Sequence, residues 1–277
     1  MVDKDLYSIG EVSKICNVSK KTLRFYDEIG LVSPDQIGGE NNYRFYTRKS
    51  LLTVPIIKYY KQMGFKLEEM RELLDGNNYE VFGRHFRRKI DELRELEKQV
   101  YESYHSVKDW YELILEAESV IEYNATEVSV KYLESSECCY MEQDFEFKYM
   151  ESIINIDFTN YLDSFDSAIT GPVVIMFPSF RDRIDETSKR IRILQKPIRI
   201  KDKKVEMMKF GGCMMLSCYH VGAHETMKVT YEKMMQYAKD HGYQCADESY
   251  ERYVTDYWTT RNADQFVTEI LIRVTKT

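Results

Sequence analysis

Apolar positions in the first 76 residues recur at helical spacing, and short polar breaks separate them. Ile9, Val12 and Ile15 predict a short helix that begins after a capping Ser8. A tight break follows, and residues 19–28 then predict a second helix, which ends near a glycine. Two short helices joined in this way have the spacing of a helix-turn-helix.

The pattern then changes from helical spacing to alternation and back. Residues 34–46 combine a proline, two glycines and asparagines with alternating aromatic side chains, which predicts a β-hairpin, or wing. Two more helices are expected over residues 50–64 and 66–76, the first capped by Thr47. Pro55 either produces a kink in the first of these helices or marks a later start.

One long helix is predicted over residues 79–118, which contain no proline. Its apolar side chains follow alternating steps of four and three residues, interrupted only at Glu97. These apolar residues are Phe86, Ile90, Leu93, Val100, Tyr104, Val107, Tyr111 and Ile114. So long an apolar seam needs a partner, which is either the rest of the same chain or a second copy of the helix.

From about residue 123 the period falls to two, which predicts strands. A first round has a helix over 149–165 and strands at 126–134, 139–147 and 169–180. A second round, with strands at 203–222, 248–258 and 265–274 and a helix over 225–242, repeats that order. The sequence therefore predicts an α+β fold whose second half contains an internal duplication.

Charge and cysteine content narrow the function classes. The 277 residues carry a formal net charge of −7, so any affinity for nucleic acid must come from a local cationic patch. No segment reaches the roughly 18 uninterrupted apolar residues of a membrane helix, and no apolar leader opens the chain, so a soluble, cytoplasmic protein is expected. Cys138 and Cys139 are adjacent, which leaves soft-metal binding or oxidation open beside the commoner role of packed thiols.

Four motifs follow one another along the first 75 residues: IGEVSK, LRFYDEIGL, YRFY and KQMGFKLEEMRELL. In this order and spacing they resemble the N-terminal domain of the MerR family of transcription regulators. The resemblance implies a recognition helix at 19–28, a first wing at 34–46 and a second wing at 64–66. It also implies DNA contacts from Lys20, Lys21, Thr22, Arg24, Tyr26, Tyr43, Arg44, Lys61 and Lys66. Arg44 has a competing role, because an arginine between the aromatic residues of a wing can form a salt bridge within the fold.

The same resemblance implies an assembly and its partners. In this family the long helix forms an antiparallel coiled coil between two subunits, so a homodimer through residues 79–118 is expected. The implied division is a DNA-binding domain at 1–75, a dimerisation helix at 76–120 and a ligand-binding domain at 121–277. The implied partners are double-stranded promoter DNA and RNA polymerase, and the implied activity is transcription activation through distortion of the promoter.

The order of elements in the second half is similar to the GyrI-like ligand-binding domain of multidrug-binding activators in this family. Such a domain is expected to hold a hydrophobic, cationic ligand among aromatic rings, with a buried carboxylate opposing the positive charge. The resemblance places the acid at Glu251, in the motif SYE, and Glu269 is the second candidate. The candidate lining residues, each of which is more often a core residue, are Phe147, Tyr149, Tyr219, His220, Tyr253, Tyr257 and Trp258.

The ligand class stays open. Multidrug sensors continue after SYE with an apolar run and a proline, whereas this chain reads RYVTDYW. The alternative is a regulator whose GyrI-like domain binds a narrow neutral ligand, or hydrolyses a small molecule with Glu251 assisted by His220 or Tyr253. The sequence contains no nucleophile elbow, phosphate loop or H-E-x-x-H signature, so neither catalysis nor a cofactor is expected.

Overall fold

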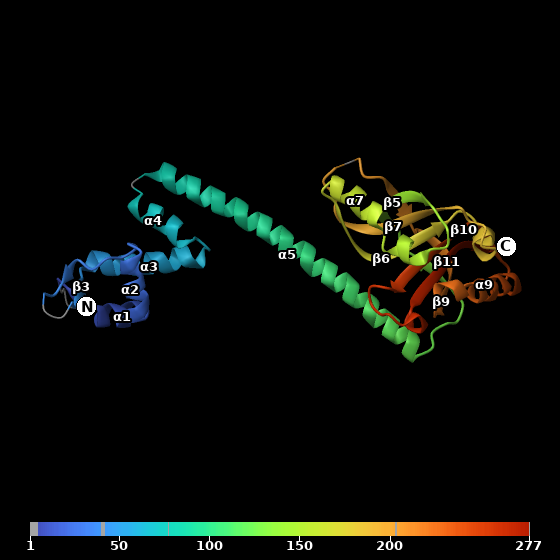
Figure 1. Ribbon diagram of the computed structural model, residues 1–277, viewed down its shortest axis with the longest axis horizontal. Coiled ribbons are helices and arrows are strands. Elements are labelled where there is room, and N and C mark those ends of the chain that lie inside the picture. Colours follow the sequence, from blue (N-terminus) through green and yellow to red (C-terminus); the bar gives the residue numbers. More distant parts are fainter. Residues whose placement is uncertain (1–4, 40–41, 77, 203, 277) are drawn as a thin grey trace. The chain divides into compact units, whose positions relative to one another are not determined.

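The computed structural model describes residues 5–39, 42–76, 78–202 and 204–276. It divides into two compact units, Met1–Lys98 and Gln99–Thr277 (Figure 1). One helix, α5 (Tyr79–Glu122), begins in the first unit and ends in the second. Within the described ranges, no helix is long and apolar enough to cross a membrane.

The first unit contains the predicted helix-turn-helix and wing. Its other elements are β1 (Tyr7–Ser8), α1 (Ile9–Cys16), α2 (Lys20–Glu28), β2 (Gln36–Ile37), β3 (Arg44–Tyr46), α3 (Arg48–Gln62) and α4 (Leu67–Asp75). Ser8 forms the predicted capping box with Glu11, whose carboxylate accepts the Ser8 backbone N–H at 2.9 Å. Pro55 lies inside α3, which begins at residue 48, so the late start proposed for this helix is wrong.

The wing is fastened to the rest of the first unit at its base. Strand β3 pairs with β2 on one side and, on the other, with β1, which directly precedes α1. Glu40 and Asn41, part of the predicted turn, lie outside the described residues. Leu23 of α2 and Tyr46 of β3 are fully buried in one core, to which Phe86 of α5 adds its ring against Phe65. The core therefore fixes α2, the wing and the start of α5 in one body.

The second unit is built on an antiparallel sheet in the order β4-β9-β11-β10-β6-β7-β5-β8. Its strands are β4 (Ser129–Leu133), β5 (Ser136–Asp144), β6 (Ala168–Phe177), β7 (Arg190–Arg199), β8 (Met207–Phe210), β9 (Cys213–Val221), β10 (Tyr243–Thr255) and β11 (Val267–Lys276). Strands β5, β6 and β7 form one half and β9, β10 and β11 the other, and β6 pairs with β10 at the centre. This arrangement confirms the internal duplication.

The two halves exchange their short edge strands. Strand β4 continues into β5 but pairs with β9, and β8 continues into β9 but pairs with β5, in one register on both sides of the crossing. Gly211 lies at the crossing with a φ of 89°, and a Cβ there would stand 2.2 Å from the carbonyl oxygen of Glu134. Only glycine permits so close an approach of these two segments of the chain.

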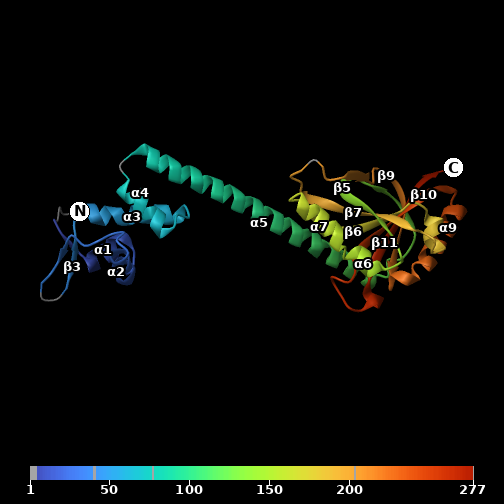
Figure 2. The same ribbon diagram turned by 45° about the horizontal axis from the view of Figure 1, so that its top comes forward.

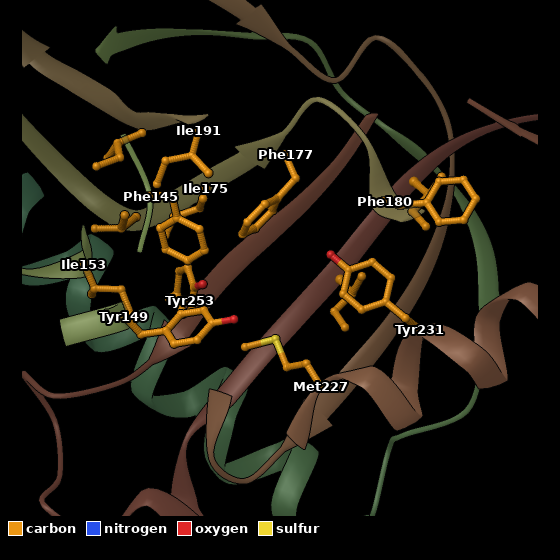
Figure 3. Packing of buried hydrophobic residues seen from close by; sticks show 14 of the residues in the cluster. Phe145, Tyr149, Ile153, Ile175, Phe177, Phe180, Ile191, Met227, Tyr231 and Tyr253 are labelled. Atoms are coloured by element: carbon orange, nitrogen blue, oxygen red, sulfur yellow. The ribbon is translucent and has the colours of Figure 1, made fainter. Parts of the chain in front are cut away.

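The sheet separates two sets of buried side chains. One face carries a large aromatic cluster, part of which Figure 3 shows, together with α6 (Tyr149–Ile153), α7 (Ile156–Ser164) and α9 (Lys228–Asp240). Helices α7 and α9 lie towards opposite ends of the sheet in both views (Figures 1 and 2). The other face receives the end of α5, whose Leu113 and Ala117 pack with Val254 and Val267.

Two sequence predictions for this unit need correction. The helix expected over 149–165 is two helices, because the Asn155 side chain accepts the Phe158 backbone N–H and starts α7 afresh. Strand β7 and the short helix α8 (Phe180–Ile184), except Phe180 at the end of the predicted strand 169–180, fall in a segment where the pattern predicts no element. Charged side chains and Pro197 interrupt the alternation of β7, and its neighbours β5 and β6 supply the pairing that the sequence alone does not indicate.

Candidate functional sites

A cationic groove lies between α2 and the wing of the first unit. Its volume is about 330 Å³, and it is lined by Ser8, Ile9, Gly10, Lys20, Arg24, Asn42, Tyr43 and Arg44. Ser19 caps α2 by accepting the backbone N–H of Thr22 at 2.9 Å. Lys20, Lys21 and Arg24 are exposed on this helix. The groove therefore combines a helix N-terminus with three cationic side chains, two from α2 and Arg44 from the wing.

Arg44 also has the competing structural role. Its Nε donates a hydrogen bond to Oδ2 of Asp27 at 2.8 Å, which ties the wing to the last turn of α2. Because the guanidinium still lines the groove, one side chain both orients the wing and adds positive charge to the site.

The remaining residues of this unit that were predicted to contact DNA differ in how far they are exposed. Tyr43, Lys61 and Lys66 are exposed, and Thr22 is half-buried. Tyr26 is only 5% exposed and packs in the core, because it follows Leu23 by three residues and lies on the buried side of α2. The expectation that Tyr26 contacts a DNA groove is corrected accordingly: its ring anchors the helix.

Charge is distributed unevenly between the two units. Residues 1–98 contain 18 Lys and Arg against 16 Asp and Glu, whereas residues 99–277 contain 21 against 30. The acidic balance of the whole chain therefore comes from the second unit, and the groove lies in the unit that is slightly basic.

In the second unit, Glu251 belongs to an aromatic box that already holds a cation. The guanidinium carbon of Arg183, on α8, lies 5.4–5.9 Å from the ring centroids of Phe147, Tyr149, Phe177 and Tyr231. Figure 3 shows Tyr149 and Tyr231 reaching into this interior from opposite sides. We call the four rings, Arg183 and Glu251 the arginine box.

The carboxylate of Glu251 is fully satisfied inside the arginine box. Its Oε1 accepts Nε of Arg183 at 2.6 Å and the hydroxyl of Tyr231 at 3.1 Å, and its Oε2 accepts the hydroxyl of Tyr253 at 2.7 Å. Arg183 is 2% exposed and Glu251 is not exposed at all. Glu251 is therefore not an unpaired acid that awaits a ligand, since Arg183 stands where a ligand cation was expected.

Two histidines border this region and carry no charge. His224 is fully buried and stacks on Phe266, with Tyr257 edge-on to both rings, and burial lowers the pKa of His224 to about 3. His220, a predicted lining residue, bonds through its ring nitrogens to the hydroxyls of Thr226 and Thr230. Burial lowers the pKa of His220 as well, and the hydrogen bond of His220 to Thr230 joins β9 to the start of α9.

Glu269 and Tyr219 lie on the opposite face of the sheet, against α5. Glu269 accepts Nε of Arg252 at 2.8 Å and the hydroxyl of Ser217 at 2.5 Å. Burial would raise the pKa of Glu269, but Arg252 and Lys131 lower it below its ordinary value. Tyr219 donates its hydroxyl to Glu116 of α5 at 2.7 Å. These two predicted ligand residues thus form a structural network away from Glu251.

A second cavity, which we call the tryptophan cleft, lies where α5, α6, α7 and the residues after β10 meet. Its volume is about 380 Å³, and it is lined by Trp110, Ile153, Ile154, Asn155, Ile156, Thr159, Asn160, Ile169, Val173, Gln195, Asp256 and Trp258. Trp110 of α5 meets Trp258 edge to face, with 4.1 Å between ring centroids. Of the predicted lining residues, Trp258 alone belongs to this cleft.

Asp256 is the cleft residue that the sequence prediction missed. Its side chain is 1% exposed, and its Oδ1 accepts the backbone N–H of Trp258 at 3.0 Å. Burial raises the pKa of Asp256 to about 6, although that hydrogen bond acts in the opposite direction. No cationic side chain in the described part of the chain pairs with it. The signal for this residue was the aspartate in VTDYW, between a strand and two aromatic side chains.

The adjacent cysteines do not form a site. Cys138 and Cys139 point to opposite faces of β5 and belong to different buried clusters. Burial raises the pKa of Cys139 to about 11, which keeps its thiol protonated. Within the residues that the structure describes, no group of three or more His, Cys, Asp and Glu side chains could hold a metal ion.

Comparison with known families and curated proteins gives separate matches for the two parts of the chain. Residues 7–77 match the family described as MerR HTH family regulatory protein, and residues 172–275 match the GyrI-like small molecule binding domain. The multidrug-efflux transporter 1 regulator of Bacillus subtilis (strain 168) is 42% identical over 100 residues, which is 34% of this chain and 36% of that protein. The transcriptional regulator CueR of Escherichia coli O157:H7 is 36% identical over 99 residues, which is 34% of this chain and 71% of CueR. The match therefore spans about a third of the first relative and most of the second.

Solved structures give a further comparison. A chain of the EcmrR–DNA complex in EcmrR-RPo, determined by cryo-EM, is 21% identical and covers 98% of this chain, with a TM-score of 0.47. The crystal structure of the N-terminus of MtaN, the Bacillus subtilis multidrug transporter activator, is 27% identical over 37% of this chain, with a TM-score of 0.34.

Proposed function

Because the chain belongs to the MerR family of helix-turn-helix regulatory proteins, we propose that it regulates transcription by binding promoter DNA as a homodimer and a small-molecule effector in its second unit. The observation that carries the proposal is the cationic groove between α2 and the wing. The proposed division of labour assigns DNA to residues 1–75, dimerisation to residues 76–120 and the effector to residues 121–277.

The groove can contact the phosphate backbone of DNA while α2 reaches the edges of the bases. Lys20 and Lys21, in the first turn of α2, would neutralise phosphates, and Arg24 lies one turn further along the exposed side. Tyr43 is 57% exposed on the wing, where it can pack against sugar and phosphate. The Arg44–Asp27 salt bridge would hold the wing at a fixed angle to α2, so that both reach the duplex together.

A second copy of the chain is the partner that the long helix requires. On α5 an apolar stripe is exposed, with side chains between 44% and 69% accessible: Ile90, Leu93, Leu96, Val100, Tyr101, Tyr104, Val107, Tyr111 and Leu115. From Ile90 to Leu115 this stripe runs for about 40 Å at 1.5 Å per residue, which suits an antiparallel coiled coil between two subunits. A two-fold dimer would match two-fold related half-sites in DNA.

We propose that the dimer activates transcription, with RNA polymerase as its second macromolecular partner. DNA distortion by the dimer would change the relative positions of the two promoter elements that polymerase contacts. Two relatives are named as regulators of multidrug-efflux transporters, and this supports a hydrophobic effector. The acidic balance of residues 99–277 supports a cationic one.

The hydrolytic alternative is less well supported. A general base needs a carboxylate oxygen free to accept a proton from water or substrate. In the arginine box, Glu251 instead accepts one guanidinium and two tyrosine hydroxyls. His220 is committed to two threonine hydroxyls on the same face.

DNA binding can be tested with one pair of variants. A duplex selected by the wild-type protein from a randomised pool would be titrated at several salt concentrations and followed by fluorescence anisotropy. We expect Arg24→Ala to weaken binding and to lower the slope of log K against log salt by about one, as for the loss of one phosphate contact. The matched control is Arg273→Ala, an exposed arginine of the second unit. If both variants bound like the wild type, the groove would not be the DNA site.

A further inference from the structure

The acid that the second unit keeps without a cation is Asp256, not Glu251. Both side chains are at most 1% exposed. Glu251 has a guanidinium at 2.6 Å, whereas the only hydrogen bond to the Asp256 carboxylate that the described residues supply comes from the backbone N–H of Trp258. A buried carboxylate normally pairs with a cation, because an isolated charge loses its hydration without compensation. Asp256 therefore lacks the partner that every other strongly buried acid of this unit possesses.

The surroundings of Asp256 define what such a partner would look like. Two indole rings and the apolar side chains of Ile153, Ile169 and Val173 line the same cavity. The rim includes Ile154 and Ile156, which are 49% and 72% exposed, so apolar surface continues outwards from the cavity. A cavity of about 380 Å³ with one carboxylate and aromatic walls is within the size range of small-molecule sites.

We propose that the tryptophan cleft binds an amphipathic organic cation, with its aromatic or alkyl part against Trp110 and Trp258 and its positive charge against Asp256. This inference rests on the proposed sensor function of the second unit, and it adds the site and the residues that select charge. A neutral ligand would leave the carboxylate unpaired, and an anion would face it directly. Indole faces favour a cation as well, through their quadrupole.

The arginine box explains why the cation is held in the cleft and not beside Glu251. Four aromatic rings and one carboxylate form a cation site, but Arg183 occupies it from within the chain. A ligand entering there would have to displace a guanidinium that is 2% exposed, and would leave it buried without its carboxylate. The cleft requires no such displacement.

The cleft also places the ligand on the dimerisation helix. Trp110 belongs to α5, which continues from the second unit into the first. A ligand that separates or wedges Trp110 from Trp258 would act directly on this helix. The chain contains only two tryptophans, and both line the cleft, so tryptophan fluorescence reports on this site alone.

The test uses two shape-matched ions of opposite charge. Tetraphenylphosphonium and tetraphenylborate would be titrated against the full-length protein, with tryptophan emission and calorimetry as readouts. We expect saturable binding of the phosphonium with a change in emission, and no binding of the borate at the same concentrations. Asp256→Asn, which keeps the shape of the side chain, should weaken phosphonium binding about tenfold or more. Asp247→Asn, an exposed acid of β10, is the control and should bind like the wild type.

A second pair of variants tests the proposed site even if Asp256→Asn does not fold. Ile156 is 72% exposed at the rim, so it can be replaced without disturbing the core. Ile156→Arg offers the cleft an internal cation, as Arg183 does in the arginine box, and should weaken phosphonium binding. Ile156→Glu adds negative charge at the same position and should preserve or strengthen phosphonium binding.

Three results would overturn the inference: no saturable phosphonium binding, equal binding of the borate, or phosphonium affinity that neither Asp256→Asn nor Ile156→Arg lowers. DNA binding of the same preparations, measured by anisotropy, distinguishes this failure from failure of the proposed function. Intact DNA binding without charge-selective binding in the cleft would reject the cleft and leave the regulator assignment in place. Charge-selective binding in the cleft without DNA binding would reject the regulator and leave the cleft.

Discussion

At the scale of single residues, Asp256 is destabilising in the ligand-free chain, and the effect depends on pH. Burial raises its pKa from 3.8 to about 6, so the folded protein holds this proton more tightly than the unfolded chain does. The destabilisation is absent below the unfolded pKa and fully present above the folded one. At pH 7.5 it amounts to roughly 3 kcal/mol, at about 1.4 kcal/mol per pKa unit.

We therefore expect Asp256→Asn to be more stable than the wild type at pH 7.5, with a difference that shrinks as the pH falls through 6 towards 4. The measurement is thermal unfolding of the second unit, followed by tryptophan emission, at pH 5, 6 and 7.5. Asp247→Asn should show no such trend, because that side chain is 75% exposed. A constant difference at all three pH values would mean that Asp256 does not titrate in this range.

Glu251 should behave in the opposite way, as a stabilising partner. Glu251→Gln leaves the buried guanidinium of Arg183 without its counter-charge, and we expect a loss of about 3–5 kcal/mol in the free energy of unfolding. The double variant Arg183→Met/Glu251→Leu should lose less than the sum of its single variants, since it removes both charges. Urea unfolding of the four proteins would measure this coupling. Additive losses would contradict a direct pair.

The sequence indicated which residues belong to these sites better than it indicated which side chains they contact. The family resemblance placed a buried acid at Glu251, but the sequence does not reveal that Arg183, 68 residues away on a five-residue helix, reaches it. That contact depends on how β6, α8 and β10 pack together, which is long-range information. Tyr26 was mistaken for a surface residue because its helix is short and both of its sides carry aromatic rings.

At the scale of elements, α5 carries an exposed apolar stripe on one side and acidic residues that pair with the sheet on the other. Its apolar stripe was predictable from the spacing of three and four residues. On the other side, three acids seven residues apart bind basic side chains of the sheet: Glu102 with Arg199, Asp109 with Lys196, and Glu116 with Arg252. In the sequence these acids look like a solvated face, because nothing local shows that a sheet carries the matching cations.

The apolar stripe leads to a prediction about assembly. A carboxylate placed on the stripe would be buried in the coiled coil, so we expect Val107→Glu to convert a dimer into a monomer at micromolar concentration. Gln99→Glu adds the same charge on an exposed position of the helix away from the seam and should remain dimeric. Light scattering would measure the mass against 33.0 kDa for one chain. A monomeric wild type would contradict the proposed dimer.

At the scale of the whole molecule, the sequence predicted the duplication and the order of most elements, because stretches of strand-like and helix-like periodicity follow one another with turns between them. It missed β7 and α8. It did not predict that β4 and β8 exchange between the halves, since strand partners 68 to 88 residues apart leave no local pattern. Gly211 lies inside the segment 203–222 that the pattern predicts as strands, and its place at a crossing of two strands became clear only in the fold.

Communication between effector and DNA has to pass through α5 if the proposed function holds, because this helix belongs to both units. The ion pairs of Glu102 and Asp109, at 2.5 and 3.4 Å, would transmit a shift of the sheet to the helix. We expect Glu102→Gln/Asp109→Asn to bind both DNA and tetraphenylphosphonium nearly as the wild type does. Its ligand-dependent gain in transcription in vitro should nevertheless fall at least about fivefold, the lower end of ordinary allosteric coupling.

The control for this prediction is Glu112→Gln, which removes an exposed acid whose ion-pair partner, among the described residues, is Lys108 of the same helix. Equal responses of the two variants would show that the contacts of Glu102 and Asp109 with the sheet carry no coupling. Collapse of ligand or DNA affinity in the double variant would show that these pairs hold the fold together and do not transmit a signal. If the double variant keeps both affinities but loses the response, the pairs couple the two units, because in the proposed mechanism the effector changes the shape of the bound DNA.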